Sequence, residues 1–194
     1  MGALAQNGLT YAEGEFDRER YHELQQIAAE MLAALADAPP AVLAPLLAAE
    51  AGYATPKVDV RAAVFHEGKL LLVREREDGR WTLPGGWADV GDTPGEAVAK
   101  EVLQESGFRV RPVKLLAVYD RERHGHPPLA WHVYKLFIRC ELLGGTAAPS
   151  LETDAVGFFG ENELPPLSLT RVLPAQLRRL FEHARHPHWP ADFD

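Results

Sequence analysis

The sequence has one cysteine, Cys140, among its 194 residues. A single cysteine excludes an intramolecular disulfide and a zinc site built from several thiolates. Cys140 lies in the apolar stretch 131–142, so we expect a buried, unreactive thiol. One free thiol also suits a reducing compartment.

Long apolar runs are missing as well. The longest apolar patch, residues 41–49, is far shorter than the ~20 residues that cross a bilayer. Residues 1–15 contain neither the basic nor the apolar segment of a secretory signal. We therefore predict a cytoplasmic protein without a membrane partner.

Positive charge is scarce, since 20 Lys and Arg stand against 28 Asp and Glu, a net charge of -8. Such a protein does not attract phosphates by its bulk field, which argues against nucleic acid as a partner. A polyphosphate ligand would need a local device, such as a divalent cation held by clustered carboxylates.

The N-terminal third is helical in pattern, and we assign residues 1–56 to a separate helical unit. Residues 1–14 have little pattern and are expected to be a mobile lead-in. A helix follows with Asp17 as its N-cap, and a second, short helix ends at Gly52. The apolar stripe of the first helix comprises Tyr21, Leu24, Ile27, Ala28, Met31, Leu32 and Leu35.

This helical hairpin allows two roles, because a two-helix unit of this length buries little apolar surface by itself. It either packs on the main domain or forms a dimer interface. For the assembly we predict a homodimer.

Residues 57–194 alternate between strand and helix patterns. Strands are predicted at 58–64, 69–74, 81–83, 109–120, 131–142 and 156–159, and helices at 94–106 and 174–184. This order predicts an α+β domain in which a mixed sheet lies between helices, an α/β/α sandwich.

The segment 85–108 reads GGWADVGDTPGEAVAKEVLQESGF. Thr93, Pro94 and Glu96 form a capping-box pattern that begins the helix, and Gly107 ends it. At about 100° per residue, we expect one side to face the core and the other to carry polar groups. The core side comprises Val98, Ala99, Val102 and Leu103, and the polar side Glu101, Gln104 and Glu105.

Two carboxylates and an amide on one patch repel each other without a partner. Mg²⁺ prefers oxygen ligands and often uses one or two carboxylates plus substrate phosphates. Gly85 and Gly86, just before the helix, let the backbone approach a ligand. Taken alone, the Glu101 and Glu105 pair also fits a solvated acidic helix face.

The segment resembles the Nudix box, G-x5-E-x7-R-E-U-x-E-E-x-G-U, where U is a bulky aliphatic residue. The opening glycine, the E-U pair, the last glutamate and the closing glycine are matched by Gly86, Glu101, Val102, Glu105 and Gly107. Asp92, Lys100 and Gln104 replace Glu, Arg and Glu, and Phe108 fills the last apolar position loosely. The spacing is intact.

The resemblance extends over nearly the whole chain. The helical N-terminus and segments 55–61, 87–91, 127–128, 132–135 and 168–171 are similar to a Nudix subgroup that has an N-terminal helical unit and includes CDP-choline pyrophosphatases. It implies hydrolysis of a nucleoside diphosphate linked to another moiety, a nucleotide-type small molecule, with Mg²⁺ or Mn²⁺.

The resemblance also implies roles for the box residues. Glu101 and Glu105 would be the principal metal ligands, with the backbone oxygen of Gly86, and Gln104 would offer an uncharged amide oxygen. Lys100 would orient Glu101 or neutralise a phosphate. Glu105 is the candidate for activating the water that attacks phosphorus.

Residues outside the box have two readings each. Glu152 is either a further acidic ligand or a loop carboxylate, and Arg74 and Arg76 either meet a phosphate or are solvated surface cations. We also assign Trp87, Asp120 and His132 to substrate binding, Trp87 by stacking on a base. The loop carrying Asp120 is either a lid or a plain surface loop.

Three further expectations remain. His183, His186 and His188 invite a metal reading, but we expect a solvated tail. A hydrolase of nucleoside triphosphates or RNA ends is an alternative activity. A catalytically weakened binding or regulatory module is an alternative that Gln104 supports.

Overall fold

A computed structural model describes residues 1–36 and 39–194. They form two compact units, Met1–Pro56 and Lys57–Asp194. The first long helix is described as far as Ala36, and residues 37–38 after it lie outside the described residues. No helix in the described part of the chain is long and apolar enough to span a bilayer.

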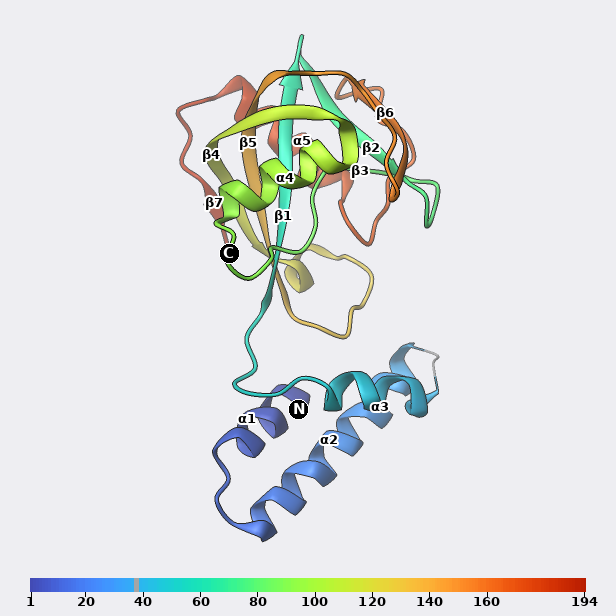
Figure 1. The fold of residues 1–194 in the computed structure, drawn as a ribbon, viewed down its shortest axis with the longest axis vertical. Helices are drawn as coiled ribbons and strands as arrows, with labels where there is room; N and C mark the ends of the chain where they lie inside the picture. The colour runs from blue at the N-terminus through green and yellow to red at the C-terminus, as the bar shows by residue number, and fades with distance from the viewer. Residues whose placement is uncertain (37–38) are drawn as a thin grey trace. The chain divides into compact units, whose positions relative to one another are not determined.

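The N-terminal unit contains α1 (Gly2–Tyr11), α2 (Glu15–Ala36) and α3 (Pro40–Ala48) (Figure 1). The expectation of a mobile lead-in is therefore wrong. Tertiary contacts explain α1, because Asn7 Oδ1 accepts a hydrogen bond from the Ala54 N–H at 2.6 Å and Gly8 lies against the Tyr21 ring. Such contacts supply the order that weak local propensity does not.

Two helix boundaries in this unit also differ from the prediction. Asp17 lies in the first turn of α2, which begins at Glu15, and α3 ends at Ala48 before the predicted Gly52. The hairpin is thus part of a three-helix unit.

The apolar stripe of α2 is split between buried small residues and exposed large ones. Ala28, Ala29 and Ala33 are buried. The exposed members are Leu24, Ile27, Met31 and Leu35. This arrangement leaves large apolar side chains of α2 in contact with solvent.

The second unit contains a mixed sheet, which confirms the predicted fold class. Its strands in the described chain are β1 (Lys57–His66), β2 (Lys69–Glu75), β3 (Trp81–Thr82), β4 (Phe108–Asp120), β5 (Val133–Gly145), β6 (Thr153–Phe159) and β7 (Asp192–Phe193). The order is β3-β2-β1-β5-β4-β7, and β6 pairs with β2. β1 runs parallel to β5, whereas β4 and β5 are antiparallel.

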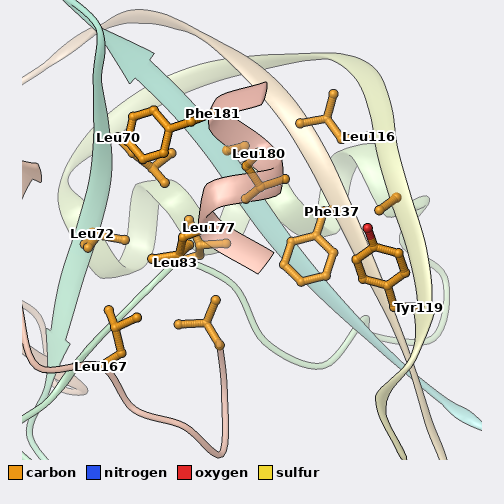
Figure 2. Packing of buried hydrophobic residues seen from close by; sticks show 13 residues of the cluster. Leu70, Leu72, Leu83, Leu116, Tyr119, Phe137, Leu167, Leu177, Leu180 and Phe181 are labelled. Carbon is orange, nitrogen blue, oxygen red and sulfur yellow. The ribbon is translucent and has the colours of Figure 1, made fainter. Parts of the chain in front are cut away.

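Helices cover both faces of this sheet (Figure 1). Val60, Ala62 and Val64 of β1 share one buried cluster with α4 (Pro94–Ser106), and Cys140 lies in it as predicted. Burial raises the pKa of that thiol to about 12. On the other face, α5 (Pro174–Arg185) contributes Leu177, Leu180 and Phe181 to a second cluster, which Figure 2 shows around Phe137.

β1 is therefore buried on both faces, and two of its charged residues, Asp59 and Arg61, lie inside the domain. A strand between two helical layers has no solvent side. Charged residues buried in this way need partners, and their partners belong to the candidate site below.

The C-terminal segment folds back onto the domain, so the prediction of a solvated tail is wrong for His183, whereas His186 and His188 are exposed. His183 is buried on α5 and lies 3.0 Å from Asp192, and His186 stacks on Trp189. Asp192 also binds Arg179 at 2.6 Å and starts β7 beside β4. This ion pair holds the segment in place.

Gly107 offers a test of the end of α4. It has φ +75, and a Cβ there would lie 2.5 Å from the Thr146 carbonyl oxygen. We expect Gly107→Ala to lower the free energy of unfolding by about 2–3 kcal/mol, because a left-handed conformation and a backbone clash add together.

Gly125→Ala is the matched control. Gly125 has φ +76 with nothing within 4 Å of the added Cβ, so only the conformational cost of about 1 kcal/mol applies. Urea denaturation of both variants measures the difference. Equal losses would contradict the close packing at Gly107.

Candidate functional site

The start of α4 is fixed by the predicted capping box. Thr93 Oγ1 accepts a hydrogen bond from the Glu96 N–H at 3.2 Å, and the Glu96 carboxylate accepts one from the Thr93 N–H at 2.9 Å. These bonds satisfy donors that an open helix start leaves unpaired. The register of every polar group on α4 follows from this start.

The two faces of α4 differ from the prediction. Glu105 is only 4% exposed and lies on the same buried side as Val98 and Val102, whereas Leu103 is 50% exposed. Gln104 is exposed. The reason is rotational: at about 100° per residue, position 105 lies only about 20° around the helix from position 98 and about 60° from position 102. The carboxylates thus project from the edge of the buried face, and Gln104 points away from Glu105.

The loop before α4 receives these carboxylates. The Gly85 N–H donates a hydrogen bond to Glu105 Oε2 at 2.8 Å. Gly85 has φ +144, and a Cβ there would lie 2.0 Å from the Val60 carbonyl oxygen. A Cβ on Gly86 would lie 2.9 Å from Glu101 Oε1. Only glycine permits so close an approach at both positions.

The backbone oxygen of Gly86, a predicted metal ligand, accepts a hydrogen bond from the Val60 N–H at 2.8 Å. A carbonyl oxygen has two lone pairs, so one acceptor position remains for another group.

Burial raises the pKa of Glu105 to about 8, with further contributions from Glu101 and Glu75. The pKa of Glu101 is raised for the same first reason, and the charge of Glu152 adds to it. Glu152 is exposed beside β6 and also raises the pKa of Glu75. The structure therefore brings Glu152 near the box carboxylates and adds Glu75, which the sequence did not single out.

Arg61 is the main opposing charge of this acidic group. It is the first-named charge that lowers the pKa of both Glu101 and Glu105. The side chain is 6% exposed, and its Nε donates to Asp59 Oδ1 at 2.8 Å. Asp59 is also paired with the buried Lys135. A signal for this pair was present in the sequence, since Asp59 and Arg61 interrupt an otherwise apolar stretch of the strand.

Lys100, predicted to orient Glu101 or meet phosphate, points elsewhere. Its Nζ donates to Asp89 at 2.7 Å and to Asp92 at 3.4 Å. These carboxylates raise the pKa of Lys100. Lys100 therefore ties the loop of residues 89–92 to α4, and Asp92 supports that loop.

Arg74 and Arg76 are both engaged by the segment around β6. Arg74 pairs with Asp154 at 2.6 Å, and Arg76 donates to the Ser150 carbonyl oxygen at 3.1 Å. The interleaved Glu75 is buried and lies 3.3 Å from Arg171. Neither arginine is a plain solvated cation, and both would have to rearrange to bind a phosphate.

Trp87 is half exposed and follows the glycine loop, where its backbone forms a bridge with Asp59. Its side chain is thus accessible to a ligand next to the glycine loop. Asp120 and His132 lie together, with 3.4 Å between their side chains.

Asp120 also accepts a hydrogen bond from the Glu122 N–H at 3.1 Å and so caps a short helix, η1 (Arg121–His124). His126 follows η1 and lies 3.0 Å from Gln176 of α5. This loop is therefore anchored to the domain, unlike a plain surface loop.

The donor set was compared with the needs of a divalent cation. Among the described residues, no group of three or more His, Cys, Asp or Glu is arranged to hold a metal ion. Two carboxylates and a backbone oxygen still suit Mg²⁺, which keeps waters and takes phosphate oxygens from a substrate. The residues present therefore fit a metal site that the substrate completes.

Comparison with known proteins identifies relatives over the whole chain. A family model described as "UDP-X-like, N-terminal oligomerisation domain" matches residues 1–47, and the NUDIX domain model matches residues 55–181. A Bacillus subtilis protein named "Putative ADP-ribose pyrophosphatase YjhB" is 46% identical over 192 residues, covering 99% of this chain and 92% of that protein.

Two solved structures are similar. An ADP-ribose pyrophosphatase from Streptococcus suis is 45% identical with a TM-score of 0.67, covering 72% of this chain and 100% of that one. A UDP-X diphosphatase is 34% identical with a TM-score of 0.68, covering 100% of this chain and 94% of that one.

The raised pKa of Glu105 makes the stability of the metal-free protein depend on pH. A carboxyl whose pKa rises from 4.5 unfolded to about 8 folded keeps its proton in the folded state, so stability falls as pH rises between these values. Glu105→Gln has no such proton. We expect its stability relative to wild type to increase by at least about 1 kcal/mol from pH 5 to pH 8.

Urea denaturation in EDTA at several pH values measures this difference. Because both proteins share all other titrating groups, the difference isolates Glu105. A difference that does not change with pH would show that Glu105 has an ordinary pKa.

Proposed function

Because the chain belongs to the NUDIX family and is a Nudix hydrolase, we propose that it is a metal-dependent pyrophosphohydrolase of nucleoside diphosphates linked to another moiety. The main observation behind this proposal is that Glu101 and Glu105 lie against the Gly85–Gly86 backbone. The relatives named for ADP-ribose and UDP-X support this substrate class. CDP-alcohols belong to the same class.

Glu101 and Glu105 would hold Mg²⁺ or Mn²⁺, with the free lone pair of the Gly86 oxygen and Glu152 as further donors. The cation supplies charge that polarises the phosphate and offsets the negative charge of the transition state. Gln104 is exposed and brings no charge, so we assign the cation mainly to the two glutamates.

Glu105 is our candidate for the general base. The Gly85 N–H fixes one carboxylate oxygen and leaves the other for a water. We assign Trp87, which is half exposed, to stacking on a base, and Lys100 to holding the following residues 89–92.

The substrate class is tested by a panel of UDP-sugars, ADP-ribose, CDP-choline and nucleoside triphosphates with Mg²⁺ and Mn²⁺. We expect at least one nucleoside diphosphate conjugate to give a nucleoside monophosphate, separated by chromatography. Absence of turnover across the panel would refute the enzymatic function and favour the binding module. Turnover of triphosphates alone would favour the alternative activity.

Removal of the proposed base tests the site within this activity. Glu105→Gln should lower kcat by at least about 100-fold, because general base catalysis contributes that much. Glu163→Gln, in an exposed loop carboxylate, is the matched control and should leave kcat unchanged. If Glu105→Gln retains wild-type kcat, Glu105 does not act in the reaction.

We further propose that the N-terminal unit forms a homodimer through α2. The exposed residues Leu24, Ile27 and Met31 recur at spacings of three and four, as in a helix–helix seam. The oligomerisation model that matches residues 1–47 supports a second copy as the partner.

Light scattering at micromolar concentration tests the dimer. Wild type should have twice the 21.4 kDa chain mass, and Ile27→Glu with Met31→Glu should have the chain mass. Gln26→Glu, which adds a charge about 130° around α2 from the centre of this seam, is the control and should remain dimeric. A monomeric wild type would exclude the interface.

A further inference from the structure

The guanidinium of Arg61 is fixed from two directions. Its Nε donates to Asp59 Oδ1 at 2.8 Å and its Nη1 to the Leu83 carbonyl oxygen at 3.2 Å. Asp59 is itself held by Lys135, which is 1% exposed. A side chain held in this way cannot swing away when a second charge arrives nearby.

One nitrogen of this guanidinium remains free. Nη2 of Arg61 makes no hydrogen bond to any residue in the described part of the chain. The same charge lies close enough to Glu101, Glu105 and Glu75 to lower the pKa of all three carboxyls. The geometry agrees with this proximity: Gly85, whose N–H binds the Glu105 carboxylate, lies against the Arg61 backbone, because a Cβ on Gly85 would be 2.9 Å from the Arg61 Cα.

At this position, the positive charge of Arg61 opposes the binding of a cation. A divalent cation at Glu101 and Glu105 would meet the positive charge of Arg61 in a poorly solvated place, where repulsion is weakly screened. Lys135 adds to the positive charge behind Arg61, and only Asp59 opposes it within that buried group. A diphosphate would relieve the conflict, because its oxygens can bind the cation and accept a hydrogen bond from Nη2.

We propose that Arg61 couples the binding of the divalent cation to the binding of the substrate diphosphate. Arg61 lowers the affinity of the free protein for the cation. It raises that affinity once a diphosphate lies between the cation and the guanidinium. This inference rests on the proposed function. It assigns Arg61, which lies outside the box, as a diphosphate-binding residue that keeps the site from filling before substrate arrives.

A purely structural ion pair has different consequences. If Arg61 only stabilised the fold around Asp59, its removal would leave cation affinity unchanged or lower it. Coupling instead predicts that removal of Arg61 has opposite effects on two affinities. The affinity for the cation rises, and the affinity for the diphosphate falls. The direction of the change in cation affinity therefore separates the two roles.

The experiment is a Mn²⁺ titration of the full chain, followed by the electron paramagnetic resonance of free Mn²⁺. Without nucleotide, Arg61→Met should bind Mn²⁺ about tenfold more tightly than wild type, and Arg61→Lys, which keeps the charge, within about twofold of wild type. Lys69→Met, at an exposed lysine at the start of β2, is the control and should match wild type.

A second titration includes uridine 5′-(α,β-methylene)diphosphate, whose phosphorus–carbon bridge is not hydrolysed. Wild type should bind Mn²⁺ about tenfold more tightly when this analogue is saturating, after correction for Mn²⁺ held by the analogue in solution. Arg61→Met and Arg61→Lys should lose most of this gain, because neither presents the Nη2 donor.

The outcomes separate the inference from the proposed function. Equal or weaker Mn²⁺ binding by folded Arg61→Met overturns the coupling. If circular dichroism shows that Arg61→Met is unfolded, an undiminished analogue effect in Arg61→Lys overturns it instead. Wild type that binds no Mn²⁺, or Glu101→Gln and Glu105→Gln variants that bind it normally, refutes the metal site itself.

Discussion

The Gly85 N–H donates a hydrogen bond to the buried Glu105 carboxylate, and Gly85 itself is packed closely against the Val60 backbone. The acid therefore lies against a backbone that cannot move away from it. Burial and the neighbouring glutamates raise the free energy of the charged form, so the metal-free protein keeps a proton there. In the proposed metal site, a divalent cation would remove this cost by replacing the proton. The same event would then complete the site and relieve the repulsion between its carboxylates.

Charge balance in the whole second unit follows from this constraint. Arg61 pairs with Asp59 of the same strand, and Asp59 pairs in turn with Lys135 of the neighbouring strand β5. The sheet therefore supplies a rigid counter-charge to a helix that would otherwise bury two like charges. The domain carries this local positive group inside a chain of net charge -8.

Much of the fold could be predicted from sequence where local signals are strong. The capping box of Thr93 and Glu96 fixes α4 to the residue, and apolar alternation places β1 and β2. α1 and β7 were missed because each depends on contacts with distant residues: Asn7 with Ala54, and Asp192 with Arg179. Periodicity carries no information about such contacts.

The sequence predicted which residues form the candidate site better than it predicted where their side chains lie. The box pattern names Glu101 and Glu105, but one helical step decides whether a side chain is exposed, so Glu105 and Leu103 were placed on the wrong sides. The pattern could not show that Arg61 lies at the site. Its role depends on the register between β1 and β5 and on the glycine loop that is hydrogen-bonded alongside β1.

The most direct test of the central claim is the anomalous diffraction of Mn²⁺ in a crystal of the protein with the methylene-bridged diphosphate. The account predicts a Mn²⁺ peak that shares carboxylate oxygens of Glu101 and Glu105 with oxygens of the diphosphate. A Mn²⁺ peak bound elsewhere, with both glutamates unligated, would contradict it.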